Sequence, residues 1–458
     1  MKQNFYLKLG IIIALIICLM LPQAFMLGLV GERAGWRQQA YQSIQHSWPG
    51  MQTIAGPVLS IPYYLTYNTK EKIIGADKKA TEIIKEITVH DALYLIPKQL
   101  NIESKLQSSL RYHGIYAVPV YTSAVQVTGE FSTQPLLDLI ARNKDYKIRW
   151  EKPQLSVLVG DQRGIAAPPS LTWNGTKIAF QPGGNLPGTV AGMHVNVPDM
   201  TQAQETRIPF AFDMELRGMR SINFALLSEN TNVRLAANWP HPSFTGELLP
   251  EKREITDQGF TAQWRASSFS YNVSNALDRC RNKGECLSLL ESAVGFELIQ
   301  PVDVYQQSER SIKYAEMFII LTFVALILFE LLKKVRVHPI QYVLVGMALL
   351  VFYLLLISLS EHIQFLLAYG VAALSSTALL TFYFGGILHS RKLGLILGAG
   401  LSTLYVSLYV ILQAEESALL MGSLLLFIVL AALMLATRHF DWYALTTGQG
   451  DTASETQK

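Results

Sequence analysis

Residues 340–387 read IQYVLVGMALLVFYLLLISLSEHIQFLLAYGVAALSSTALLTFYFGGI. Two apolar blocks, Ile340–Leu359 and Ile363–Ile387, are separated only by Ser360, Glu361 and His362. An α-helix needs about 20 predominantly apolar residues to cross the hydrocarbon core of a bilayer. Both blocks are long enough, and the connection between them is very short. The stretch therefore predicts a hairpin of two transmembrane helices.

Similar apolar blocks occur elsewhere in the chain. One of them, Leu7–Val30, lies at the N-terminus and contains a single lysine near its start, at Lys8. Three more follow Lys313, and together with the hairpin they predict a C-terminal bundle of five helices. These three are Met317–Leu332, Leu393–Leu412 and Ala418–Ala436. The sequence thus predicts six membrane spans, one at the start and five at the end.

The composition supports a membrane protein. Of the 458 residues, 50% are hydrophobic and 16% are charged, with a mean hydropathy of +0.24. In soluble domains, about a quarter of all residues are charged. A net charge of +3 argues against a nucleic-acid-binding protein with a large basic surface. Three cysteines are too few for a disulfide scaffold or a four-cysteine zinc site.

The positions of lysine and arginine predict the orientation, because these residues are enriched in short cytoplasmic loops. The loops at 360–362 and 413–417 contain neither residue. We therefore expect both termini and the tail, residues 438–458, to be cytoplasmic, and residues 31–313 to be periplasmic if the cell has two membranes. The cationic residues on the predicted cytoplasmic side are Lys2, Lys8, Lys333, Lys334, Arg336, Arg391, Lys392 and Arg438.

The first apolar block can also be interpreted as a signal peptide. It is too long for a typical signal sequence, and no A-x-A cleavage site follows it. Cys18 suggests a lipoprotein site, but bulky Ile17 precedes it and the apolar run continues beyond it. We favour an uncleaved anchor at residues 1–30, and we expect Cys18 to be a buried hydrophobic residue.

Residues 31–313 predict a β-rich domain that is long enough to hold two subdomains. Between Ile208 and Leu216, bulky apolar residues alternate with other residues, which is typical of a strand with one buried face. Residues 217–219 can turn the chain into a partner strand at 222–224, which predicts a hairpin. Further strands are predicted near 125–127, 195–197, 233–235 and 260–264. Three helices are predicted near 36–44, 136–140 and 287–294.

Cys280 and Cys286 lie in this predicted exterior domain. Disulfides persist outside the cytoplasm, so we favour a disulfide that closes a small loop, with two free thiols as the alternative. Such a loop contributes about 2 kcal/mol of stability in the chain-entropy model. The spacing differs from the redox-active C-x-x-C motif, so no catalytic role is predicted.

The common catalytic motifs are missing from the sequence. It contains no G-x-S-x-G, Walker A or H-E-x-x-H pattern. His194 and His241 lack nearby partner histidines, and residues 161–164 suggest a salt-bridged turn. We therefore predict a protein that is not an enzyme, with no catalytic residue, no metal site and no cofactor.

Ionisable side chains near the ends of the predicted spans are the candidate functional residues, because such groups are costly at membrane depth. One interpretation is a polar cluster that acts as a relay, a lipid contact or an interface. The other is that these residues only cap helices. Glu330 has a simpler explanation, an ion pair with Lys334 one helical turn away. The members of the predicted cluster are Lys313, Glu316, Glu361, His362, Gln364, Gln413, Glu415 and Glu416.

Several segments, in order along nearly the whole chain, resemble the CreD family of bacterial inner membrane proteins, also called cell envelope integrity proteins. The densest similarity is at 340–346 and 352–362. The other segments are Gly31–Arg33, Gly56–Pro62, Arg111–Tyr116, Trp239–Gly246, Pro301–Tyr305, Lys313–Glu316 and Thr437–Tyr443.

The resemblance implies an anchor, a large periplasmic domain, a helical bundle and a role in envelope integrity and in stress or colicin tolerance. The resemblance implies no biochemical activity and no catalytic residue. Our leading hypothesis is a non-enzymatic protein of the lipid bilayer whose periplasmic domain contacts an envelope protein or lipid, without nucleic acid. A transporter or lipid-handling protein that uses the bundle is the alternative, followed by an envelope signal sensor and a membrane-bound hydrolase. The sequence leaves the oligomeric state undecided.

Overall fold

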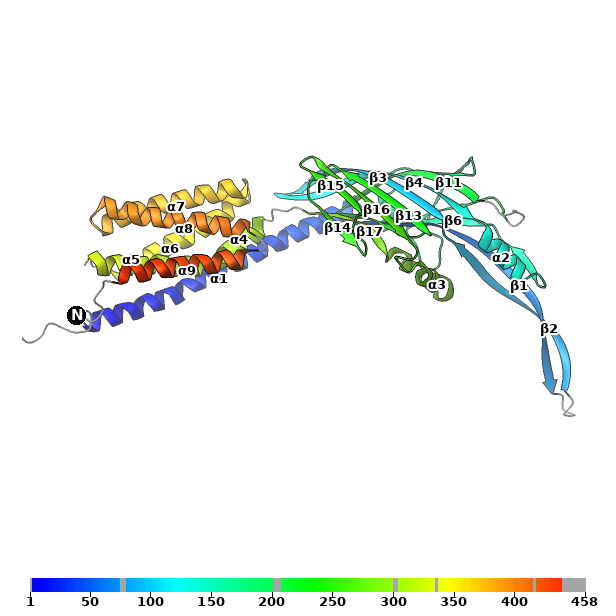
Figure 1. Ribbon diagram of the computed structural model, residues 1–458, viewed down its shortest axis with the longest axis horizontal. Helices are drawn as coiled ribbons and strands as arrows, with labels where there is room; N and C mark the ends of the chain where they lie inside the picture. Colours follow the sequence, from blue (N-terminus) through cyan, green and yellow to red (C-terminus); the bar gives the residue numbers. More distant parts are fainter. Residues whose placement is uncertain are drawn as a thin grey trace, which may run out of the picture. The chain divides into compact units, whose positions relative to one another are not determined.

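The computed structural model describes residues 2–74, 80–200, 207–299, 304–333, 337–414 and 417–438 (Figure 1). The chain forms two compact units. One comprises 39–301, and the other combines 1–38 with 302–458. Our predicted exterior domain, 31–313, included helix α4 (Val304–Lys313), which packs in the second unit instead. The buried residues of α4, among them Tyr305 and Ile312, account for this packing.

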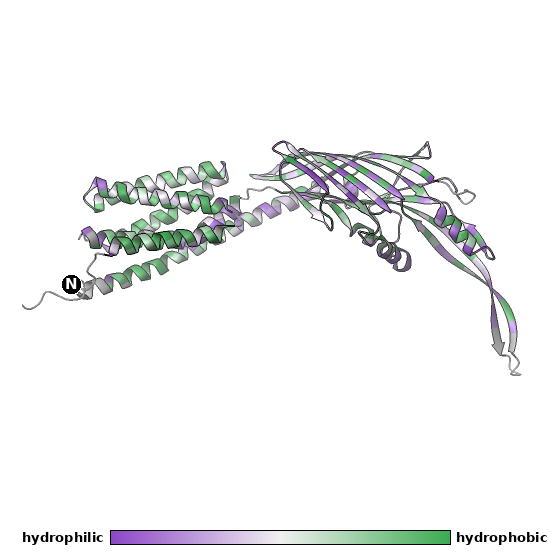
Figure 2. Cartoon of the chain, viewed as in Figure 1, coloured by the Kyte–Doolittle hydropathy of each residue, from purple (hydrophilic) through white to green (hydrophobic). Residues whose placement is uncertain are grey.

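The second unit is a set of apolar helices, as Figure 2 shows. Among the described residues, five helical segments are long and apolar enough to cross a membrane, one N-terminal and four C-terminal. The last helix is also apolar, but its qualifying part, Leu419–Leu435, is shorter, so the sixth span stays a prediction. Besides α4, the helices are α1 (Lys2–Ser47, to Gln38 in this unit), α5 (Ala315–Lys333), α6 (Pro339–Ser360), α7 (Phe365–Ile387), α8 (Arg391–Gln413) and α9 (Ala418–Thr437).

The predicted helical hairpin is present as α6 and α7. His338 caps the start of α6 in a capping box with Gln341, and Pro339 occupies the first turn, where its missing N–H costs nothing. The helix ends at Ser360, and α7 begins at Phe365. The two apolar blocks of the sequence therefore correspond closely to two helices.

Small residues bring α7 and α8 into close contact. A Cβ atom added to Gly394 would lie 2.7 Å from the Cα of Gly385 and 2.9 Å from the carbonyl oxygen of Thr381. Gly398, one turn further along α8, also packs against Thr381. This is the small-xxx-small packing by which membrane helices approach each other closely. We did not predict this contact from the sequence.

The expectation that Cys18 is buried was wrong. Cys18 is a free, exposed cysteine on α1, and its neighbours Leu21 and Phe25 are 71% and 75% exposed. On a membrane helix an apolar side chain can face lipid, so hydrophobicity alone does not indicate which face contacts protein.

The first unit contains two β-sheets. The nine-stranded sheet has the order β14-β17-β12-β1-β6-β10-β9, with β2 and β5 also paired to β1. Its strands are β1 (Gln52–Ile74), β2 (Ala80–Leu95), β5 (Lys147–Trp150), β6 (Gln154–Leu158), β9 (Gln181–Pro182), β10 (Gly192–Asn196), β12 (Ser221–Ala225), β14 (Pro242–Gly246) and β17 (Ala293–Leu298). The long β1–β2 hairpin extends away from the sheets (Figure 1).

The eight-stranded sheet has the order β15-β16-β13-β3-β4-β11-β7-β8. Its strands are β3 (Gln99–His113), β4 (Tyr116–Ser132), β7 (Ser170–Trp173), β8 (Thr176–Ala179), β11 (Arg207–Met219), β13 (Asn230–Ala237), β15 (Lys252–Thr256) and β16 (Gly259–Ser267). Both sheets contribute to one core, in which Phe260 of β16 contacts Phe296 of β17 with ring centroids 4.6 Å apart. Helix α2 (Gln134–Arg142) confirms the helix predicted near 136–140.

The strand predicted at 208–216 is confirmed as part of β11, in which the bulky apolar residues are buried and alternate with more exposed residues as expected. The predicted hairpin with 222–224 is wrong. Arg220 adopts a positive φ of 69°, and the chain leaves one sheet for the other. There β12 pairs in parallel with β1 and antiparallel with β17. Sequence alternation identifies a strand but does not identify its partners.

The helix predicted at 287–294 is also wrong. Cys286–Leu290 form a short 3-10 helix, and Ala293 begins β17, which pairs on both sides. A helix that the sequence analysis missed, α3, spans Val273–Lys283. Its boundary signals are visible in the sequence, because Asn272 caps its start and Gly284 ends it with a φ of 69°.

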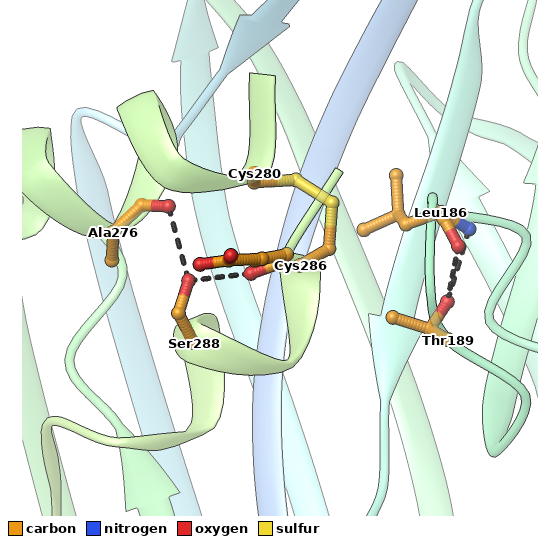
Figure 3. The surroundings of a disulfide bond; sticks show 7 residues. Leu186, Thr189, Ala276, Cys280, Cys286 and Ser288 are labelled. Atoms are coloured by element: carbon orange, nitrogen blue, oxygen red, sulfur yellow. Dashed lines mark hydrogen bonds between the residues drawn. A yellow bond between two sulfur atoms is a disulfide. The ribbon is translucent and has the colours of Figure 1, made fainter. Parts of the chain in front are cut away.

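Cys280 and Cys286 are joined by a disulfide, the pairing that the sequence favours (Figure 3). Both cysteines are fully buried. The hydroxyl of Ser288 donates to the carbonyl oxygen of Ala276 at 3.3 Å and to that of Glu285 at 2.7 Å. The disulfide and these bonds hold α3 against the 3-10 helix.

Candidate functional site

Glu361 is a described member of the predicted polar cluster with a largely buried side chain. It directly follows α6, and its side chain is 9% exposed. Its Oε1 accepts a hydrogen bond from the hydroxyl of Tyr305 at 3.3 Å and lies 3.6 Å from the Nε of Arg33. One carboxylate therefore connects α1, α4 and the end of α6. Neither Arg33 nor Tyr305 was a predicted site residue.

The other described members of the cluster interact locally. Lys313 pairs with Glu309 at 2.7 Å. His362 contacts the carbonyl oxygen of Ser358, and Gln413 donates to the hydroxyl of Tyr409. Gln364 precedes α7 without a capping bond from its side chain, and Glu316 lies in the first turn of α5. Glu415 and Glu416 lie outside the described residues. Convergence of the whole cluster therefore stays a prediction.

A second ion pair involves Glu330 of α5. Lys8 of α1 pairs with the Glu330 carboxylate and also donates to the carbonyl oxygen of Val337 at 2.6 Å. The hydroxyl of Tyr342 donates to the same carboxylate at 3.1 Å. Lys334, the partner that the sequence suggested, lies outside the described residues. The partner found is distant in sequence, so helical spacing could not reveal it.

The two ion pairs lie at opposite ends of the membrane-spanning part of α1. Lys8 and Arg33 are 25 residues apart, which corresponds to about 37 Å at the α-helical rise. This length lies between the thickness of the hydrocarbon core and that of the whole bilayer, about 30 and 40–45 Å. Between them, Gln23 donates to the carbonyl oxygen of Ile312 at 3.0 Å. Polar contacts thus hold α1 to α4, α5 and α6 at three levels.

Hydroxyl groups also connect α7 and α8. Tyr369 donates to the carbonyl oxygen of Tyr405 at 2.6 Å, and Ser376 contacts the Tyr405 hydroxyl at 3.0 Å. The ring of Tyr405 lies 4.5 Å from that of Phe352 on α6. These residues serve helix packing.

The last turns of α1 pack in the β-rich unit. The indole of Trp48 donates to the carbonyl oxygen of Gly218 at 2.9 Å, and the guanidinium of Arg111 lies 5.0 Å from the Trp48 ring centroid. Ser43 contacts His113 at 3.3 Å. Ile44 belongs to a small buried cluster with residues of β4 and β11. One continuous helix is therefore part of both units.

The segment 161–164 forms the predicted salt-bridged turn and fixes the chain just after α1. Asp161 accepts hydrogen bonds from the backbone N–H groups of Gly50 and Arg163, and it pairs with the Arg163 guanidinium at 2.6 Å. Arg163 also donates to the carbonyl oxygen of His46. The hydrogen bonds from Arg163 and Gly50 outweigh the effect of burial and lower the pKa of Asp161 to about 2.

Asp161→Asn is expected to lower the stability of the β-rich unit by about 1 kcal/mol near neutral pH, since part of the interaction is screened by solvent. A carboxyl whose pKa is lower in the folded state stabilises above its unfolded pKa, here 3.8, and loses this effect as the pH falls towards 2. Thermal unfolding of both proteins between about pH 6 and pH 2 should show a difference that disappears at the acidic end. A constant difference would contradict the ionic origin.

The eight-stranded sheet carries shallow hollows on its exposed face. One of them, about 520 Å³, lies over β3, β13, β15 and β16. Its charged lining residues have both signs, and Arg234 pairs with Glu103 across the strands at 3.3 Å. The other charged residues of this hollow are Lys105, Lys252, Arg253 and Glu254. Within the described ranges, no group of three His, Cys, Asp or Glu side chains could hold a metal ion.

The fold and these contacts define a multi-pass helical membrane protein with a large β-rich domain inserted after its first helix. The family model for the inner membrane protein CreD matches residues 4–443. The inner membrane protein CreD of Escherichia coli (strain K12) is 31% identical over 448 residues, covering 97% of this chain and 95% of that protein. The chain therefore belongs to the CreD family and is an inner membrane protein.

The similarity to solved structures is much weaker. An M1 zinc metallopeptidase from Deinococcus radiodurans matches 37% of this chain and 38% of its own, with 9% identity and a TM-score of 0.18. A point mutant of that metallopeptidase, bound to a Tyr-Ser-Ala substrate, gives the same TM-score with 8% identity and covers 37% of this chain and 39% of its own. Likeness at this level carries no argument about fold or function.

Proposed function

We propose that this protein is a non-enzymatic component of the inner membrane that supports envelope integrity and tolerance to stress or colicins, through contact between its β-rich domain and an envelope partner. The observation that carries this proposal is the continuous helix α1, which is tied to the bundle by Lys8 and Arg33 and to the sheets by Trp48. The exposed, hollowed face of the eight-stranded sheet is the proposed contact surface.

The proposed orientation places both termini in the cytoplasm and the β-rich domain in the periplasm. The distribution of lysine and arginine supports it. The disulfide between Cys280 and Cys286 also supports it, because disulfides persist in the periplasm and are rare in the cytosol. Reporter fusions at the two ends of the chain and within residues 75–79 would test it directly.

Complementation is the test of the proposed function. In a strain that lacks the protein and has a measured envelope defect, Lys105→Glu/Arg234→Glu is expected to restore tolerance at least about tenfold less well than wild type, because it reverses the charge of the proposed contact surface. Arg142→Glu/Lys283→Glu makes the same change of charge at other exposed positions and should restore fully. Each variant must reach the membrane at normal abundance.

The bundle variants Glu361→Gln and His362→Ala separate this proposal from the transport alternative. If they restore tolerance while Lys105→Glu/Arg234→Glu does not, the exterior domain carries the function. If the surface variant restores and Glu361→Gln fails, the proposal is wrong and the transporter or lipid-handling hypothesis replaces it. Buried hydroxyl groups in the bundle are the observation that supports this second candidate.

A further inference from the structure

Four buried oxygen atoms near the Glu361 end of the bundle have no hydrogen-bond partner among the described residues. Three are hydroxyls, of Ser308, Ser311 and Tyr353, and the fourth is the Oε1 of Gln307. The exposed fractions of Ser308, Ser311 and Tyr353 are 1%, 0% and 2%. A buried polar group without a hydrogen bond destabilises the folded protein, so these oxygens are expected to have a partner in the membrane.

Other hydroxyls of the same unit bond to their own helices. Thr322 donates to the carbonyl oxygen of Phe318 at 2.8 Å, Ser360 to that of Ile357 at 3.0 Å, and Thr403 to that of Ala399 at 2.9 Å. This local bond is open to any helical serine. Ser308 and Ser311 do not form this bond, so their hydroxyls are available to a partner outside their own helix.

The unpaired hydroxyls lie on α4 and α6, two helices that contact each other. On α4, Tyr305, Ser308 and Ser311 are three residues apart and share one face. On α6, Tyr353 lies two helical turns before Glu361 on the same face. The bond between Tyr305 and Glu361 joins these faces at one end.

Both sets of hydroxyls lie at similar depth. Ser311 is six residues from Tyr305, and Tyr353 is eight residues from Glu361, which correspond to about 9 and 12 Å along the helices. The two helices run in opposite directions, because α5 continues α4 towards Tyr342 at the start of α6, where Tyr342 contacts Glu330. The polar groups therefore form one seam that leads inwards from Glu361.

We propose that this α4–α6 seam, formed by Ser308, Ser311 and Tyr353, binds a row of water molecules that enters past Glu361. Hydroxyl groups both donate and accept, and a buried water makes about three hydrogen bonds, so water can satisfy every unpaired oxygen of the seam. The seam contributes no charged side chain below Glu361, which disfavours an ion as its ligand.

The hydrated seam ends before the opposite side of the bundle. Gly346 of α6 packs directly against the Leu19 side chain of α1, and a Cβ added there would also lie 3.1 Å from Phe323. Water therefore reaches the middle of the bundle from the Glu361 end without crossing it. This inference goes beyond the proposed function, since it assigns a ligand site to the membrane helices.

Radiolytic hydroxyl-radical labelling tests the proposal with the full chain in lipid nanodiscs, because X-rays generate radicals from bound water in place. Tyr353 is expected to be labelled about tenfold faster than Tyr369, if water lies against only one of them. Tyr369 is a matched control, being 4% exposed and donating its hydroxyl to the carbonyl oxygen of Tyr405. Equal labelling of the two tyrosines would overturn the proposal.

A pair of variants makes the test independent of tyrosine reactivity. Ser308→Ala/Ser311→Ala removes two hydroxyls of the seam and is expected to lower the labelling of Tyr353 at least about threefold by releasing bound water. Thr403→Val/Ser407→Ala removes two hydroxyls that bond within α8 and should leave the labelling unchanged. If both variants label Tyr353 like the wild type, the seam is dry and the proposal is wrong.

Discussion

Replacing Gly394 with leucine is expected to lower the stability of the helical unit by about 3 kcal/mol, at the upper end of the usual cost of overpacking. The physical reason is that a Cβ at this position would meet the backbone of α7, at Gly385 and Thr381, instead of a side chain that can rotate away. Helices α7 and α8 must then separate, and the tyrosine and serine contacts between them weaken with the same movement.

The measurement is thermal unfolding of the purified protein in mild detergent, where this loss corresponds to a midpoint lower by about 6–12 °C. Gly400→Leu is the matched control, since it adds the same side chain to the same helix at a position with open space around it. It should change stability by less than about 0.5 kcal/mol. Equal midpoints for the two variants would show that α7 and α8 do not pack through Gly394.

Neutralising Glu330 should have the second large effect, a loss of about 2 kcal/mol, because it leaves the Lys8 ammonium partly buried without its counter-ion. The Glu330 side chain is 19% exposed and that of Lys8 is 21% exposed, so solvent relieves part of the cost of a fully buried pair. Glu330→Gln also weakens the hydrogen bond that the carboxylate accepts from Tyr342.

A double-mutant cycle isolates the ion pair from these other effects. Stability is measured for Glu330→Gln, Lys8→Gln and the double variant, and the coupling energy is expected to be about 1–2 kcal/mol. The control cycle uses Glu309→Gln and Lys313→Gln, an i,i+4 pair whose side chains are 46% and 61% exposed. Its coupling should stay below about 0.5 kcal/mol. Equal coupling in both cycles would mean that the Lys8–Glu330 pair does not stabilise the bundle.

The family and the order of anchor, β-rich domain and helical bundle could be predicted from local sequence signals. A long apolar block can cross a bilayer as a helix, because the helix pairs every backbone polar group within the segment. The alternation along 208–216 likewise required a strand with one buried face. These signals are local, since each depends on neighbouring residues, and they were therefore visible without the fold.

Which distant residues contact each other could not be predicted from the sequence. Lys8 and Glu330, and likewise Arg33 and Glu361, are far apart in sequence, and no periodicity links them. The same reason explains the wrong hairpin after β11, because Arg220 sends the chain to a different sheet. Helical and strand periods determine the face on which a side chain lies, whereas the partner of that face depends on how the elements pack.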